Sequence, residues 1–185
     1  MDVKEAIQNR RAYRSLTKVP IDTELIRDLA ECAQIAPSCY NNQPWRFVFV
    51  YTPKKLDEVY TVLSQGNQWA YQASMIIAVV SKKDFDCVVK GREYYLFDTG
   101  MACAFIILRA TELGLVAHPI AGYNEEQVKK ILRIPHDMQV ITLVNVGEHA
   151  KDMNPALSEK QAKSEKKRPE RLSLNKIMFL DEYEV

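Results

Sequence analysis

Two short segments of this chain carry side chains that could bind a planar, anionic ligand. Residues 10–14 (RRAYR) place three guanidinium groups directly after a short amphipathic segment, and guanidinium groups bind phosphate through charge and paired donors. Residues 36–47 (APSCYNNQPWRF) form the second segment. Pro37 and Pro44 fix their own φ angles and keep the residues before them out of the helical region. We therefore expect a rigid loop that presents its Ser, Asn and Gln groups to a ligand.

These two segments, in this order, resemble the nitroreductase family of FMN-dependent oxidoreductases. That family opens with a short helix, an arginine-rich turn, a second helix and a loop of the form A-P-S-x-x-N-x-Q-P-W-x-F, which residues 36–47 match almost letter for letter. The likeness continues through residues 114–123 (GLVAHPIAGY) and 140–147 to the basic tail at 166–169 (KKRP). It covers nearly the whole chain with four ordered motifs, which together are far more specific than any one of them.

The resemblance implies a set of FMN-binding residues from several parts of the chain. Arg10 would bind the phosphate, Arg11 would contribute chiefly its backbone, and Arg14 would approach the pyrimidine edge. Lys167 and Arg168 of the basic tail would complete the phosphate pocket. The 36–47 loop would reach the FMN of the partner subunit, and a backbone N–H after His118 would point at flavin N5. No catalytic side chain and no metal ligand are expected. The expected cofactor-binding residues are Arg10, Arg11, Ala12, Arg14, Pro37, Ser38, Cys39, Asn41, Gln43, Asn67, Pro119, Ile120, Ala121, Gly122, Lys167 and Arg168.

Two of these positions depart from the family pattern. Ala12 stands where relatives often have Ser or Thr, so one hydrogen bond worth about 1 kcal/mol is expected to be lost. Ala121 stands where many relatives carry Glu, which leaves a backbone donor but removes a carboxylate. His118 is interpreted as a strand-end histidine rather than a proton donor.

Plainer interpretations of the same residues remain open. The arginines of residues 10–14 could form a solvated basic turn, and the basic tail could be a mobile solvated segment or a weak nucleic-acid patch. Asn41 and Gln43 could serve as turn formers that bond to nearby backbone, and Gln43 could only brace the loop. Trp45 and Phe47 are expected in the core.

Hydrophobic spacing predicts the elements that position these segments. Residues 94–113 are apolar on nearly every face and stop at Gly114, which is typical of a helix in the centre of a protein, often between subunits. Residues 151–171 resemble a linker. The other predicted helices cover residues 2–9, a stretch after Asp22, a stretch from Thr52-Pro53, and a stretch after an Asn124/Gln127 capping box. The predicted strands cover residues 47–51, 75–80, 139–146 and 174–180.

These elements predict an α+β fold with a mixed central sheet flanked by helices, in a single domain of residues 1–185. By resemblance, the protein would be an intertwined homodimer whose residues 174–180 pack on the other subunit. No G-x-G-x-x-G follows any predicted strand, so a separate dinucleotide-binding domain is not expected. One bound flavin would instead be visited in turn by donor and acceptor.

Composition narrows the possible partners and the compartment. The formal net charge is +1 and the pI is near 7.6, so the overall charge gives no reason to expect binding to nucleic acid or membrane. The N-terminus lacks the apolar region of a signal peptide, and no apolar run is as long as a membrane span. The four cysteines form no C-x-x-C pair and are expected as reduced thiols. The cytoplasm is the expected compartment.

The resemblance implies an enzyme that passes hydride from NAD(P)H through bound FMN to a nitroaromatic, a quinone or a similar small electrophile. One alternative is a specialised flavoenzyme on the same scaffold, and another is a flavin-binding or sensory protein with little turnover. A cofactor-free α+β dimer would leave the arginines and the amide-rich loop without a purpose.

Overall fold

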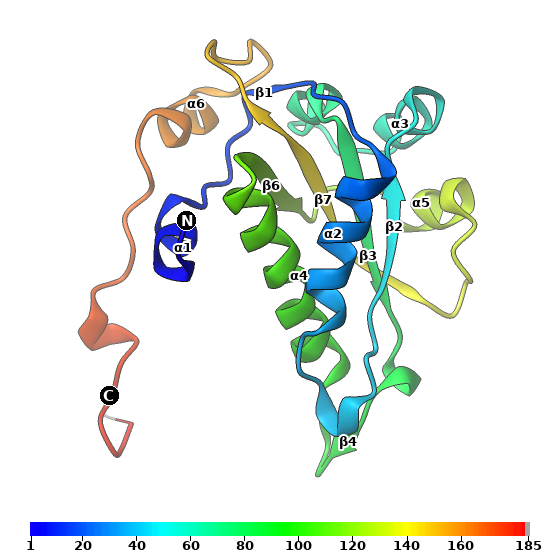
Figure 1. Cartoon of the computed structure of the whole chain (residues 1–185), viewed down its shortest axis with the longest axis vertical. Helices are drawn as coiled ribbons and strands as arrows, with labels where there is room; N and C mark the ends of the chain where they lie inside the picture. The colour runs from blue at the N-terminus through cyan, green and yellow to red at the C-terminus, as the bar shows by residue number, and fades with distance from the viewer. Residues whose placement is uncertain (184–185) are drawn as a thin grey trace.

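The computed structural model describes residues 1–183 and has an antiparallel sheet at its centre (Figure 1). Its five strands run in the order β1-β7-β3-β2, with β6 also paired to β7. They are β1 (Leu16–Thr17), β2 (Arg46–Val50), β3 (Met75–Ser81), β6 (Leu115–Ile120) and β7 (Gln139–His149). The α+β class is confirmed, but every pairing in the described part of the chain is antiparallel, so the sheet is not mixed in strand direction. A separate hairpin joins β4 (Val88–Val89) to β5 (Arg92–Glu93).

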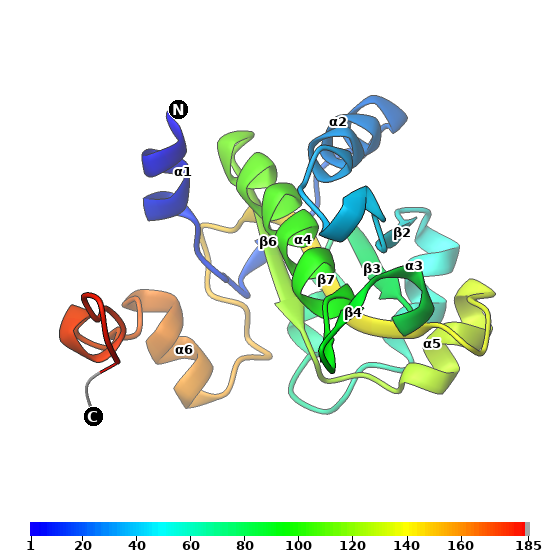
Figure 2. The same ribbon diagram turned by 90° about the horizontal axis from the view of Figure 1, so that it is seen from below.

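Helices cover both faces of the sheet (Figure 2). One face carries α2 (Thr23–Gln34) and α4 (Tyr95–Glu112), and the other carries α3 (Pro53–Tyr60) and α5 (Glu125–Leu132). The fully buried strand β3 serves both layers, because successive side chains of a strand point to opposite faces. Met75, Ile77 and Val79 pack with the α2–α4 layer, and Ile76, Ala78 and Val80 pack with the other.

Two helices lie on one side of the molecule, outside the layers that cover the sheet (Figure 2). They are α1 (Val3–Asn9) and α6 (Glu159–Lys166), which come from opposite ends of the chain (Figures 1 and 2). The extended segment that follows α1 runs next to α6 before it enters β1. The first and last parts of the chain therefore meet on one side of the molecule.

Most predicted helix ends are confirmed by side-chain caps. The Asp22 carboxylate accepts the Leu25 N–H at 2.8 Å, and Pro53 occupies the first turn of α3. Asn124 accepts the Gln127 N–H at 3.1 Å, although only this half of the predicted capping box forms.

Two predictions for the C-terminal region are wrong. Residues 174–180 contain a short 3-10 turn, Leu174–Lys176, and no strand. The segment interpreted as a linker contains α6, which begins with a complete capping box between Ser158 and Gln161. Periodicity could not detect α6 because its one fully buried side chain is a carboxylate, Glu165, and not part of an apolar stripe.

Helix α4 is only partly enclosed in a single chain. Ala102, Ile106 and Ala110 are buried against the sheet layer, whereas Phe97 is 63% exposed and Leu96 46% exposed. The prediction of an apolar central helix is therefore confirmed for one face, and the other face is uncovered. None of the described helices is long and apolar enough to cross a bilayer.

The expectation of four reduced cysteines is wrong. Cys39 and Cys87 form a disulfide, while Cys32 and Cys103 are free thiols. The bonded residues are 48 positions apart in the sequence, so spacing alone gave no sign of the pair. The fold brings them together because the loop after α2 lies against the segment that leads into β4 (Figure 1).

Candidate functional site

Arginines from both ends of the chain surround a cavity of about 210 Å³. One group comes from the segment between α1 and β1, and the other from the segment after α6. Among the described residues, none of these arginines forms an ion pair. The residues that line the cavity are Arg10, Arg11, Ala12, Arg14, Ser164, Arg168, Pro169 and Arg171.

Among the described residues, no carboxylate lines this arginine cavity. Arg10 is half-buried, and burial lowers its pKa, with further lowering by the positive charges of Arg168 and Arg171. A lowered arginine pKa means that the cationic state is disfavoured relative to water. A bound anion would relieve this penalty, so the cavity suits a phosphate group.

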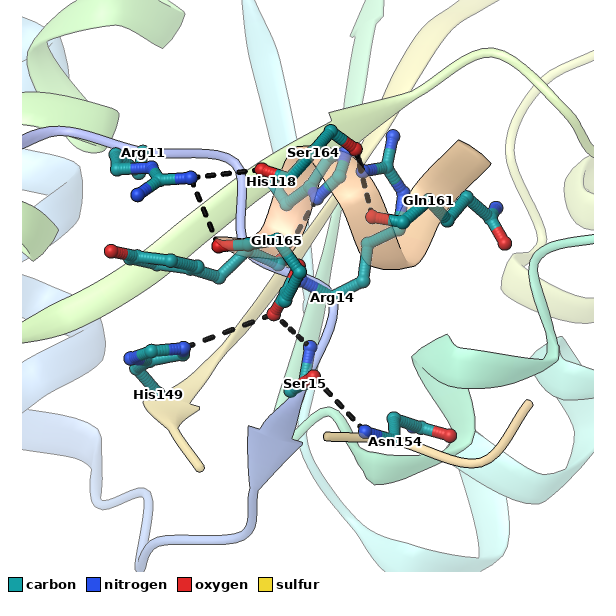
Figure 3. A network of polar contacts seen from close by, with 10 residues as sticks. Arg11, Arg14, Ser15, His118, His149, Asn154, Gln161, Ser164 and Glu165 are labelled. Carbon is teal, nitrogen blue, oxygen red and sulfur yellow. Dashed lines mark hydrogen bonds and ion pairs between the residues drawn. The ribbon is translucent and has the colours of Figure 1, made fainter. Parts of the chain in front are cut away.

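The backbone that carries these arginines is held by the end of α6 (Figure 3). The Arg11 guanidinium donates to the carbonyls of Ser164 and Glu165 at 2.8 and 3.1 Å. In return, the Glu165 carboxylate accepts the backbone N–H of Arg14 at 3.0 Å and that of Ser15 at 2.8 Å. The Arg11 Nη2 donor is thus bound to protein carbonyls at the end of α6.

Arg168 adds a further connection between the two ends of the chain. Its Nη2 donates to the carbonyls of Gln8 and Arg10, the latter at 3.0 Å. Arg168 therefore lies beside Arg10, as the sequence predicted for a shared pocket. Lys167 lines an adjacent open hollow of about 540 Å³, not the arginine cavity itself.

The turn after β6 is braced by the loop after α3. The Asn67 side-chain amide donates to the Gly122 carbonyl at 2.9 Å, and the Ser64 N–H donates to the same oxygen at 3.0 Å. A Cβ atom at Gly122 would lie 2.5 Å from Asn67 Nδ2, so a larger residue here would have to displace the Asn67 amide. Pro119 and Ala121 are exposed, while Ile120 is buried.

His118 is buried in β6 and connects this strand to the arginine segment. Its Nδ1 lies 2.9 Å from the Tyr13 carbonyl, and its ring centroid lies 4.6 Å from that of Trp69. Burial lowers the pKa of His118 to about 4. The ring is therefore neutral at pH 7, and its buried place in β6 agrees with the prediction of a strand histidine.

The loop of residues 37–43 is held by its own side chains and by α4. Ser38 Oγ accepts the Gln43 N–H at 3.0 Å, and Gln43 Nε2 donates to the Asn41 carbonyl at 3.1 Å. The buried Asp98 carboxylate on α4 accepts the Cys39 N–H at 2.6 Å. Three residues of this loop have left-handed φ angles: Tyr40 (49°), Asn41 (58°) and Gln43 (50°). Gln43 and Ser38 therefore brace the loop, and Pro37 and Asn41 are exposed.

In one chain this loop and the arginine cavity are separate. The loop lies at the end of α4 next to β4, and none of its residues lines the cavity (Figure 1). The structure thus gathers Arg10, Arg11, Ala12, Arg14 and Arg168, and separately joins Asn67 to the turn at Gly122.

Sequence reasoning missed Ser164 and Arg171 in the cavity lining and Glu165 behind it. The capping pair Ser158 and Gln161 was the available signal, since it predicts a helix that would place these residues.

Comparison with known proteins agrees with this arrangement. The chain is 26% identical over 192 residues to an NADH dehydrogenase of Thermus thermophilus, with 84% of this chain and 91% of that protein covered. Its fold matches the crystal structure of an oxidoreductase containing FMN with a TM-score of 0.85 and 26% identity, over 100% of this chain and 94% of the other. A nitroreductase family protein from Clostridium novyi NT matches with a TM-score of 0.76 and 27% identity, over 82% and 87% of the two chains.

The family assignment rests on most of the chain's length. Residues 7–68 and 61–148 match the Nitroreductase family, a span that contains the N-terminal arginines, the 37–43 loop and the turn at Gly122. By this match, the chain belongs to the nitroreductase family of oxidoreductases.

Proposed function

We propose that this protein is an FMN-dependent oxidoreductase that transfers electrons from NAD(P)H to a small electrophile such as a nitroaromatic or a quinone. The observation that carries the proposal is the cavity in which Arg10, Arg14 and Arg168 converge without acidic partners among the described residues. The family membership and the FMN held by a structural relative of 26% identity support the same cofactor.

The residues present fit FMN. Arg10 and Arg168 would hold the phosphate, with charge that no carboxylate in the cavity lining neutralises, and Arg14 would approach the pyrimidine edge. Asn67 and the turn from Pro119 to Gly122 would lie along the ring, where exposed backbone can supply hydrogen bonds despite the alanine at position 121. Bound FMN would supply the hydride acceptor and donor that no side chain provides.

We further propose that two copies of the chain complete each site. Residues 37–43 lie apart from the arginine cavity of their own chain, so they would contact the cofactor of the partner. Apolar surface is available for the association: α4 leaves Phe97 exposed, and a cavity of about 330 Å³ opens between α1, α2 and α4. The C-terminal segment also exposes Leu174, Ile177 and Leu180, which would pack on the second copy.

A visible spectrum tests the cofactor. Purified protein mixed with FMN and passed through a desalting column is expected to keep the flavin absorbance, and protein that emerges colourless would contradict the proposal. Anaerobic addition of NADH or NADPH should then bleach the flavin band. Turnover with nitro compounds and quinones separates a reductase from a flavin-binding protein that is reduced only slowly.

Sedimentation tests the assembly. The FMN-loaded protein is expected to sediment as a dimer. A flavin-bound monomer would contradict the shared site but leave the FMN proposal standing.

A further inference from the structure

We propose that Glu165 is a positioning residue for the phosphate end of the cofactor site, although it does not line the arginine cavity. This inference rests on the proposed function, since it concerns how that site holds FMN. Glu165 lies in the last turn of α6 with only 8% of its surface exposed. A buried carboxylate near the C-terminal end of a helix is unfavourable by both desolvation and the helix dipole, so strong partners must compensate.

Those partners are backbone groups of the arginine segment. Residues 11–15 have no regular secondary structure, so their N–H groups lack the partners that a helix or sheet would supply. Glu165 Oε1 accepts the Ser15 N–H at 2.8 Å, and its two oxygens accept the Arg14 N–H at 3.1 and 3.0 Å (Figure 3). His149 Nε2 lies 3.8 Å from Oε1 on the far side.

Each of the two segments binds the other, and the two sets of hydrogen bonds together fix how the segments lie relative to each other. The Arg11 guanidinium binds the carbonyls at the end of α6, while the α6 carboxylate binds the backbone just after Arg11. Two chain segments about 150 residues apart are thereby fixed in register over a few residues. The Glu165 carboxylate accepts the Arg14 N–H, and Arg168 follows Glu165 on the other segment. Both arginines line the same cavity.

Without this contact, the arginines have a reason to separate. Burial lowers the pKa of Arg10 most, and the positive charges of Arg168 and Arg171 lower it further, so both of these arginines repel Arg10. Glu165 opposes that repulsion through hydrogen bonds to the backbone, and its charge lies behind the cavity wall. Its role is therefore to hold the phosphate ligands in place, and the flavin ring is bound by other residues.

The test compares FMN with riboflavin, which has the same ring but no phosphate. Glu165→Gln leaves the side-chain shape intact but puts an NH₂ group against the Arg14 N–H. We expect the Kd for FMN to rise about 10-fold, as for the loss of a hydrogen bond to a charged acceptor, while the Kd for riboflavin stays within about twofold. The preference for FMN over riboflavin should fall by the same factor.

Glu170→Gln is the matched control. Glu170 is exposed and lies five residues further on, so the same change removes one negative charge near the same arginines. A purely Coulombic effect would strengthen FMN binding in both variants, whereas the positioning role weakens it only in Glu165→Gln. The two explanations thus predict opposite signs.

Glu165→Asp keeps the charge but withdraws the carboxylate by one methylene, and serves if Glu165→Gln does not fold by circular dichroism. It should also lose FMN preference. Equal weakening of FMN and riboflavin, or an unchanged ratio, would overturn the positioning role. Wild-type protein that binds neither ligand would instead refute the proposed function.

Discussion

The Asn67 side-chain amide donates a hydrogen bond of 2.9 Å to the Gly122 carbonyl, so it joins the loop after α3 to the turn after β6. The two residues are 55 positions apart in the sequence. Because the Ser64 N–H donates to the same oxygen, the turn is held from one side by two donors. The Asn67 amide occupies the position that a side chain at Gly122 would take, so the effects of substitutions at the two residues should depend on each other.

Gly122→Ala is expected to destabilise the protein by about 1 kcal/mol, because the new Cβ displaces the amide and breaks its hydrogen bond. In an Asn67→Ala background the same substitution should cost clearly less, since the atom it meets has been removed. Urea unfolding of the wild type, both single variants and the double variant measures the coupling. Additive effects would mean that the two residues do not depend on each other.

Reduction of the disulfide between Cys39 and Cys87 should lower the stability of the whole chain. The bond closes a segment of 48 positions, for which loss of loop-closure entropy predicts about 4 kcal/mol. Urea unfolding with and without a phosphine reductant measures this difference, and Cys39→Ser should reproduce it. Cys32→Ser is the control, because Cys32 is a free thiol. A midpoint that does not respond to reductant would show that the bond is absent in solution.

The sequence was informative wherever a local pattern decides structure. The unbroken apolar run of β3, the Asp22 cap and Pro53 at the start of α3 each predicted an element that the structure contains. The arginines near position 10 and Arg168 were also expected to share a pocket, and they line one cavity.

Local sequence patterns could not predict contacts between segments that are far apart in the chain. The proposed role of Glu165 depends on hydrogen bonds to two backbone N–H groups some 150 residues away. A single glutamate in a basic segment does not indicate such a contact. The disulfide between Cys39 and Cys87 was not predicted for the same reason, since its partners are 48 positions apart. The proposed role of residues 37–43 also depends on a second chain.

Stability should fall in mild acid because of His118. The folded state lowers the pKa of this ring from 6.5 to about 4, so the unfolded chain binds the proton first as pH falls. The folded state should therefore lose about 2 kcal/mol between pH 8 and pH 5 through this residue. His118→Asn, which can still donate to the Tyr13 carbonyl, should flatten the dependence in urea unfolding. His136→Gln should leave it unchanged, because His136 is 94% exposed on its side chain.

Salt should weaken FMN binding through the arginine cavity. The phosphate would be bound by several cations that lack carboxylate partners in the cavity lining, so screening by added salt should raise the Kd for FMN but not that for riboflavin. Arg10→Gln should raise the Kd for FMN about 10-fold at low ionic strength and reduce the salt dependence. Arg27→Gln, on the exposed surface of α2, removes the same charge away from the cavity and should change neither quantity. Fluorescence titration at two salt concentrations measures both effects. If the Arg10 variant kept the wild-type salt dependence, the phosphate would have to bind elsewhere, because burial and the charges of Arg168 and Arg171 both disfavour the Arg10 cation in the absence of an anion.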